Sequence, residues 1–131
     1  MHTVTVLTSR YLFFDGFKQP DPAVGQTWYL SQSGTSVIVV GKKFSKVVYP
    51  ESERVWKMDV KDVGIFAPTA ADIMRELPGW NLTYATEIGW HVWWDDGTEQ
   101  EYCEPLVFIH ENPAEAAALA WFHEHEKKTT K

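Results

Sequence analysis

The segment GWHVWWDDGTEQEYCE, residues 89–104, holds the side chains with the clearest potential for chemistry. If its Asp-Gly pair at 96–97 forms a tight hairpin turn, strand alternation gives one face two indole rings and two carboxylates. These side chains belong to Trp90, Trp94, Glu99 and Glu101. Such a face suits sugars or cations, because aromatic rings stack on both and carboxylates bind hydroxyls or positive charge. It is therefore an alternative ligand face, for a protein that binds a small ligand such as a sugar or a nucleotide, or for a simple hydrolase.

The two glutamates do not form a catalytic pair. Glycoside hydrolysis needs two carboxyl groups facing each other across a cleft, and side chains two positions apart on one strand cannot take that geometry. Asp95 and Asp96 are explained by the turn itself, where Asp favours the local backbone. We therefore expect no catalytic residue in this segment.

The second face of the same hairpin would present His91, Trp93 and Tyr102, which suits docking of a protein partner or self-association. A different interpretation is that the tryptophans are core residues. One face would then pack under the last helix and the other would be partly covered by the first half of the chain. The sequence leaves both interpretations open.

A metal site is suggested by HEHE at 123–126, but the spacing does not support one. His123 and His125 are two apart on a predicted helix and diverge, whereas helical ligands are three or four apart. His110 could approach one of them without supplying a third ligand. The sequence also lacks a glycine-rich phosphate loop, a nucleophile elbow and paired cysteines, so we expect no metal, no cofactor and no familiar enzyme class.

Composition limits the remaining classes. Aromatic residues make up 15% of 131 residues, with seven Trp, which exceeds ordinary usage and supplies potential interface anchors. The net charge of −6 repels phosphate backbones and so argues against nucleic acid as a partner, and its even spread along the sequence argues against a DNA mimic. Cys103 is the sole cysteine, and the N-terminus does not read as a signal peptide. We therefore expect a cytoplasmic protein that does not enter membranes.

Residues 1–66 are predicted to form an antiparallel β-meander or small barrel. HTVTVL alternates like a strand, and the Asp-Gly pair at 15–16 favours a hairpin. A two-residue turn at 33–34 would place Leu30 opposite Val37 and Trp28 opposite Val39. KVVY, RVWKMDV and VGIF would complete a sheet of roughly five or six strands.

Residues 67–131 are predicted to form an α-β-β-β-α unit. Thr69 with Asp72 resembles a capping box, and Pro78-Gly79 ends a short helix. Three strands follow, with the turn at 96–97 pairing residues 90–94 with 99–103 and with LVFIH continuing the third strand after a break at Pro105. Asn112 is the expected N-cap of the last helix, whose alanines would let it lie close to a sheet while Leu119 and Phe122 form its apolar stripe.

The helix-strand-strand-strand-helix order over 68–127 is similar in outline to double-stranded RNA-binding domains. That family places lysines at the start of its second helix, where this chain has ENPAE, so the resemblance implies a shared shape without RNA binding. PTAADIMRELPGW and ENPAEAAALAWFHEHEK also resemble small proteins of bacterial phages and mobile elements.

The sequence thus predicts an α+β protein in which the meander packs on the α-β-β-β-α unit, with one continuous core as the alternative to two subdomains. Its expected function is a non-enzymatic protein-interaction module, an accessory protein of a phage or mobile element.

Overall fold

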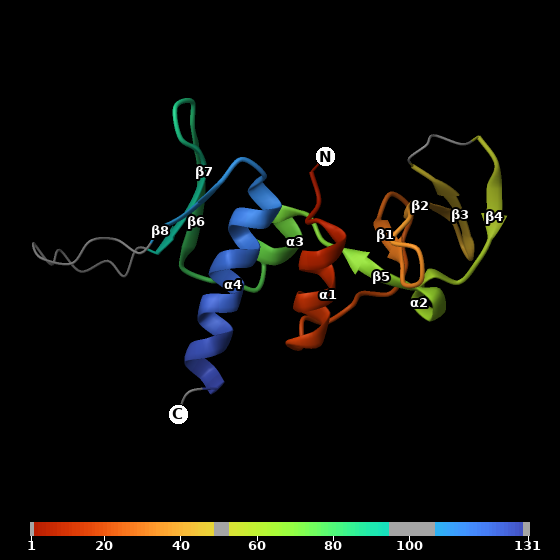
Figure 1. The fold of residues 1–131 in the computed structure, drawn as a ribbon, viewed down its shortest axis with the longest axis horizontal. Coiled ribbons are helices and arrows are strands. Elements are labelled where there is room, and N and C mark those ends of the chain that lie inside the picture. Colours follow the sequence, from red (N-terminus) through yellow and green to blue (C-terminus); the bar gives the residue numbers. More distant parts are fainter. Residues whose placement is uncertain (1, 49–52, 95–106, 130–131) are drawn as a thin grey trace, which may run out of the picture. The chain divides into compact units, whose positions relative to one another are not determined.

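The computed structural model describes residues 2–48, 53–94 and 107–129 and has the predicted α+β architecture (Figure 1). The chain divides into two compact units. Residues 5–67 form what we call the five-stranded unit, and residues 1–4 with 68–131 form the three-stranded unit. The N-terminal residues join the latter because Val4 N–H donates to the Pro68 carbonyl at 3.1 Å and Thr3 bridges to Thr69.

The five-stranded unit is an antiparallel sheet in the order β4-β3-β2-β1-β5, with two helices. Its elements are α1 (Val6–Phe14), β1 (Thr27–Leu30), β2 (Ser36–Gly41), β3 (Phe44–Val47), β4 (Val55–Lys57), α2 (Val60–Val63) and β5 (Gly64–Ala67). The predicted meander of the first four strands is confirmed, and β5 returns to pair with β1.

The predicted N-terminal strand and its Asp-Gly hairpin are wrong, because residues 6–14 form helix α1. The Thr5 side chain caps this helix by accepting from the Thr8 backbone N–H at 3.3 Å. Ser9 and Leu12, one helical turn apart, are its buried side chains. The Asp-Gly pair ends the helix instead of turning a hairpin, since Gly16 has a φ of 103° and a positive φ serves both purposes.

The hairpin of β1 and β2 forms with a register two residues away from the prediction. Trp28 lies opposite Val37, not Val39, because the connection is longer than a two-residue turn. A shift of two preserves the side-chain alternation. Trp28, Val37 and Val39 are accordingly all buried on one face, together with Phe66 of β5.

The three-stranded unit contains α3 (Ala70–Met74), β6 (Trp80–Ala85), β7 (Gly89–Trp94), β8 (Val107–His110) and α4 (Pro113–Thr129). The predicted capping box is confirmed: the Thr69 side chain accepts from Asp72 N–H, and the Asp72 carboxylate accepts from Thr69 N–H. Asn112 caps α4 as predicted, with Oδ1 accepting from Ala114 N–H at 2.9 Å.

The predicted pairing of residues 90–94 with 99–103 is wrong. Strand β7 is central, with β6 on one side and β8 on the other, so Trp90 lies opposite His110 and Trp93 opposite Val107. The register is set by burial of Val92 opposite Phe108, not by the nearest turn signal in the sequence.

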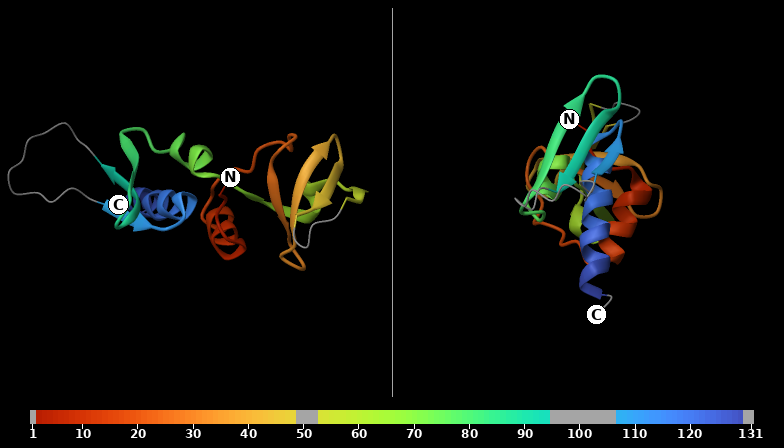
Figure 2. Two further views of the ribbon diagram at one scale, coloured as in Figure 1. Left: turned by 90° about the horizontal axis from the view of Figure 1, so that it is seen from above. Right: turned by 90° about the vertical axis from the view of Figure 1, so that its left-hand side faces the viewer.

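Helix α4 lies along one face of this sheet and also contacts α3 (Figure 2). The predicted close approach through small side chains is confirmed, since five of its alanines are buried: Ala114, Ala116, Ala117, Ala118 and Ala120. The predicted apolar stripe is only partly buried: Leu119 is 40% exposed, whereas Ala118, expected to share the stripe, and Trp121, expected to border it, are buried.

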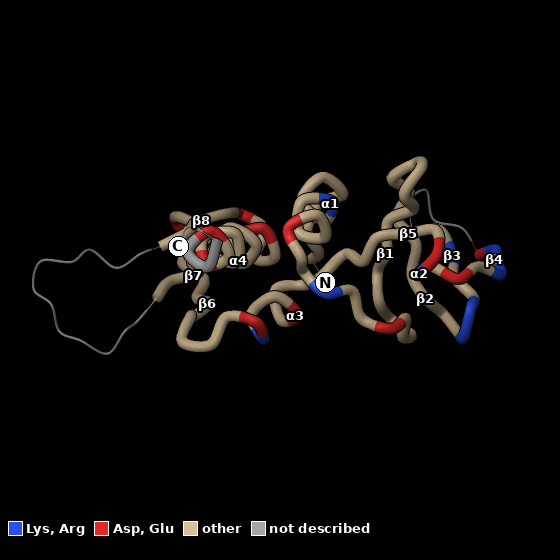
Figure 3. The backbone as a smooth tube through the Cα atoms, turned by 90° about the horizontal axis from the view of Figure 1, so that it is seen from below, with Lys and Arg blue, Asp and Glu red and all other residues tan. Residues whose placement is uncertain are grey.

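The two units differ in charge, contrary to the even spread expected from the sequence. The five-stranded unit has 8 Lys and Arg against 6 Asp and Glu, a net charge of +2, and the three-stranded unit has 4 against 12, a net charge of −8. Figure 3 shows the basic residues gathered near β3 and β4. Among the described residues, no helix combines the length and apolar character that a membrane crossing requires.

Candidate functional site

Strand β7 places His91 and Trp93 on the same face of the three-stranded sheet, as strand alternation predicts. Cross-strand pairing extends this face on both sides: Asn81 and Thr83 come from β6, and Val107 and Ile109 come from β8. We call these six residues the open face. It combines an imidazole, an indole, two aliphatic side chains and two short polar groups.

The opposite face of the sheet is the one that α4 covers. Val92, between His91 and Trp93 in the sequence, is completely buried. Trp80 on this face is also buried; its Nε1 donates to Glu124 of α4 at 3.2 Å, and its ring lies 6.3 Å from that of His123. The helix thus supplies the second layer of the core on this side.

Two side-chain hydrogen bonds orient the aromatic groups of the open face. His91 Nδ1 lies 2.9 Å from the Gly89 carbonyl oxygen, which can only accept, so Nδ1 carries the proton. The neutral ring then has Nε2 as its acceptor. Trp93 Nε1 donates to the Thr83 hydroxyl at 3.3 Å, across to the neighbouring strand. His91 and Trp93 are each half-buried, and Ile109 beside His91 is 48% exposed.

Trp90 and Trp94, the indoles of the alternative ligand face, lie on the helix-covered side with Val92 between them. Trp90 contacts Tyr84 at 5.1 Å between ring centroids, and Trp94 contacts Trp80 at 5.8 Å. Trp90 is half-buried, whereas Trp94 remains 38% exposed. The remaining predicted residues, Glu99, Glu101, Tyr102 and Cys103, fall outside the described residues.

An acidic hollow of about 300 Å³ lies at the turn that joins β6 and β7. It is lined by Tyr84, Thr86, Glu87, Ile88, Gly89 and Glu111. One of its lining residues, Gly89, is also linked to the open face, because its carbonyl oxygen is the hydrogen-bond partner of the His91 ring. Two carboxylates beside an aromatic ring form a suitable environment for a Lys or Arg side chain.

The predicted divergence of the histidines of α4 is seen in their contacts. His125 stacks on Trp121 with centroids 5.0 Å apart, whereas the His123 ring lies between Trp80 and Phe108. Within the described ranges, no group of three or more His, Cys, Asp or Glu side chains is placed to hold a metal ion.

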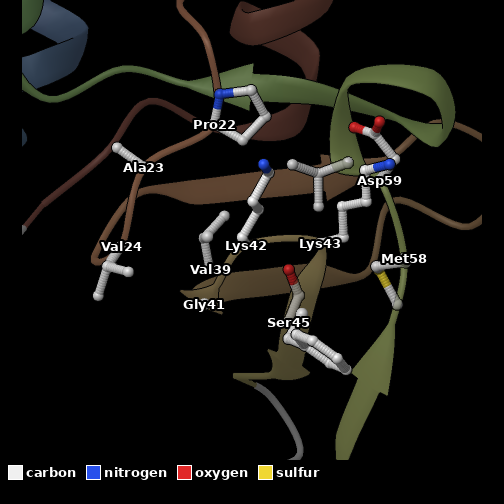
Figure 4. A pocket seen from close by; sticks show the side chains of 12 residues that line it. Pro22, Ala23, Val24, Val39, Gly41, Lys42, Lys43, Ser45, Met58 and Asp59 are labelled. Carbon is white, nitrogen blue, oxygen red and sulfur yellow. The ribbon is translucent and has the colours of Figure 1, made fainter.

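Sequence reasoning missed a cavity of about 370 Å³ in the five-stranded unit (Figure 4). It is formed by the loop before β1, the β2–β3 turn and the segment leading into α2. The lining residues are Pro22, Ala23, Val24, Val39, Gly41, Lys42, Lys43, Phe44, Ser45, Met58, Asp59 and Val60. The signal in the sequence was the Gly-Lys-Lys stretch at 41–43, which forms the β2–β3 turn. In this turn Lys43 has a φ of 60°, which is unusual for a residue other than glycine.

An ion pair joins two of the segments that form this cavity. Lys61 Nζ lies 2.7 Å from Asp21 Oδ1, next to the lining residues Val60 and Pro22 in the sequence. The hydrogen bond and charge of Lys61 lower the pKa of Asp21, and those of Asp21 raise the pKa of Lys61. Both groups are exposed, so the pair helps to hold the loop in place without contributing much to stability.

Comparison with protein-family models, curated proteins and solved structures gives no match.

Proposed function

We propose that the protein is a non-enzymatic interaction module whose open face binds a basic surface of a partner protein. The observation that carries this proposal is the register of β7, which puts His91 and Trp93 together on the sheet face opposite α4. Half-buried aromatic side chains held by hydrogen bonds lose little conformational freedom on binding, which suits interface anchors.

The charge of the three-stranded unit supports a basic partner. A net charge of −8 attracts positively charged surfaces and speeds their association. Pairing of the open face with a second copy of itself would bring two such units together, and their like charge disfavours that arrangement. The partner is therefore a different protein.

The acidic hollow supplies a second point of recognition. A Lys or Arg side chain from the partner would lie between Glu87 and Glu111, at the turn that joins β6 and β7. The resemblance of the two helical motifs to phage and mobile-element proteins leads us to seek this partner among bacterial host proteins.

The test compares two adjacent tryptophans on opposite faces of β7. Wild-type protein, Trp93→Ala and Trp94→Ala are immobilised at equal density and exposed to a bacterial lysate, and bound proteins are quantified by mass spectrometry. Circular dichroism first verifies that each variant is folded. We expect a basic protein to bind wild type and Trp94→Ala and to be lost from Trp93→Ala, because truncation of an interface anchor costs about 2 kcal/mol or more.

A further variant, Glu87→Gln/Glu111→Gln, separates recognition by charge from recognition by shape. It should weaken binding of the same protein and reduce the salt dependence of that binding. Equal capture by wild type and Trp93→Ala, or failure of the wild type to capture any protein selectively, would exclude the open face as the binding surface.

A further inference from the structure

The cavity of the five-stranded unit has the makings of a small-molecule site. Its volume of about 370 Å³ lies in the range of ligand sites, and most of its lining is apolar. Val39 of β2 contributes aliphatic surface, and Met58 and Val60, from the segment that leads into α2, contribute thioether and aliphatic surface. The cavity lies entirely within this unit, so it is independent of the open face and of the proposed protein partner.

A hydroxyl group on the cavity wall is buried without a hydrogen-bond partner. Ser45 is 1% exposed, and its Oγ has no partner among the described residues. Cross-strand pairing places it opposite Val39 on the inner face of the sheet, and Figure 4 shows the oxygen directed into the cavity. A buried hydroxyl without a partner is destabilising, so a ligand atom that bonded to Ser45 would remove this penalty.

Two ammonium groups and one carboxylate set the charge of the lining. Lys42 and Lys43 extend from the β2–β3 turn, with the Lys42 nitrogen toward Pro22 and the Lys43 nitrogen toward Asp59 (Figure 4). The Asp59 carboxylate also accepts from the Lys61 backbone N–H at 3.2 Å, which holds it at the start of α2. Two lysines and one aspartate leave a formal charge of +1, which matches one carboxylate better than a phosphate.

We propose that this cavity binds a small organic carboxylate. The apolar body of the ligand fills the space beside Val39 and Val60, its carboxylate lies near Lys42 and Lys43, and a hydroxyl or carbonyl group at the opposite end bonds to Ser45. No covalent chemistry is involved.

The test uses 6-hydroxy-2-naphthoate, which has a carboxylate and a hydroxyl at opposite ends of a flat apolar ring system. Two matched compounds each remove one group: 6-hydroxy-2-naphthamide is neutral, and 2-naphthoate lacks the hydroxyl. Titrations of the full chain are followed through backbone amide NMR shifts. We expect the shifts to centre on Gly41, Ser45 and Val60, and both matched compounds to bind about fivefold more weakly or worse.

Variants assign each end of the ligand. Lys42→Gln/Lys43→Gln should weaken binding of the naphthoate about fivefold while leaving the naphthamide unchanged. Lys46→Gln/Lys57→Gln is the matched control, because it removes the same charge from β3 and β4 residues that do not line the cavity. This control should retain near wild-type affinity.

Ser45→Ala gives a signature that a purely structural serine would not give. Removing the unpaired hydroxyl should raise the melting temperature of the free protein, and it should abolish the difference in affinity between 6-hydroxy-2-naphthoate and 2-naphthoate. The proposal is overturned if the amide shifts centre outside the cavity, if the neutral amide binds wild type as well as the acid does, or if Ser45→Ala preserves the preference for the hydroxylated compound.

Discussion

The two units each build a core around one face of an antiparallel sheet, but they leave different surfaces for binding. In the five-stranded unit the inner face surrounds Trp28, and an apolar cavity with lysines on its wall lies among the loops. In the three-stranded unit a helix covers one face, which leaves the other to present His91 and Trp93. A helix that packs on one face of a sheet leaves the other face free for binding, whereas loops that fold beside a sheet can enclose a cavity.

The largest effect should come from removing the central tryptophan of the five-stranded unit. Trp28 is fully buried, and its ring lies 5.5 Å from that of Phe66. We expect Trp28→Ala to lower the free energy of unfolding by about 3–5 kcal/mol, measured by urea denaturation. Trp56→Ala is the control, since Trp56 is 41% exposed and has Arg54 over its ring; its loss should be about 1 kcal/mol. Equal losses for the two tryptophans would contradict the assignment of the inner core.

The next test enlarges the alanine surface on which the three-stranded unit depends. Ala117 is completely buried, so Ala117→Leu should overpack the contacts of α4 and lower the free energy of unfolding by about 1–3 kcal/mol. Leu119→Ala, on the same helix at an exposed position, should change it by about 0.5 kcal/mol or less. Thermal and urea denaturation measure both changes. A larger loss for Leu119→Ala than for Ala117→Leu would indicate that Leu119 packs in the core, as the sequence predicted.

Alanine substitutions at two glycines, one in each unit, test the effect of backbone strain. Gly79 has a φ of 87°, and an added Cβ would lie 2.6 Å from the Trp94 ring. Gly16 has a φ of 103° with nothing within 4 Å of its added Cβ. Both alanine variants should lose about 1–2 kcal/mol through the unfavourable backbone conformation. The loss should be larger for Gly79→Ala, which must also displace Trp94, and Trp fluorescence should report that displacement only in this variant.

The smallest effect concerns the Lys61–Asp21 ion pair beside the cavity. Because the pKa of Asp21 is lowered, its contribution is present above the unfolded-state pKa and is lost as the pH falls through the folded-state pKa. The raised pKa of Lys61 makes its contribution disappear as the pH rises through its folded-state value. Asp21→Asn should therefore differ slightly from wild type at neutral pH and converge with it at both extremes.

An NMR titration of the Asp21 carboxyl carbon tests the same pair directly. In Lys61→Gln its pKa should return upward toward the ordinary value of an aspartate. An unchanged pKa in this variant would show that another group lowers it.

Several elements follow from local signals in the sequence. Thr69 with Asp72 and Asn112 with Pro113 specify the starts of their helices, because a cap satisfies backbone groups that lie within a few residues of it. The shared face of His91 and Trp93 likewise follows from strand alternation alone. Helix caps and strand alternation were also sufficient to predict the α+β class and the meander.

Other features depend on contacts between residues far apart in the chain. The predicted strand HTVTVL, residues 2–7, runs into helix α1 at Val6, and burial of Ser9 and Leu12 in this helix outweighs the local β-propensity. The partner of β7 is β8, since packing of Val92 and Phe108 under α4 matters more than the nearest Asp-Gly turn.

The sequence by itself determined the helix caps, the β-rich first half and the pairing of His91 with Trp93 on one face, since each depends on neighbours along the chain. Only the tertiary structure decided which face α4 covers, how β1 and β2 are registered and that Ser45 is buried in a cavity with Lys42 and Lys43. Burial and cross-strand register are properties of what lies opposite a residue in space, and that neighbour is set by the packing of the whole unit.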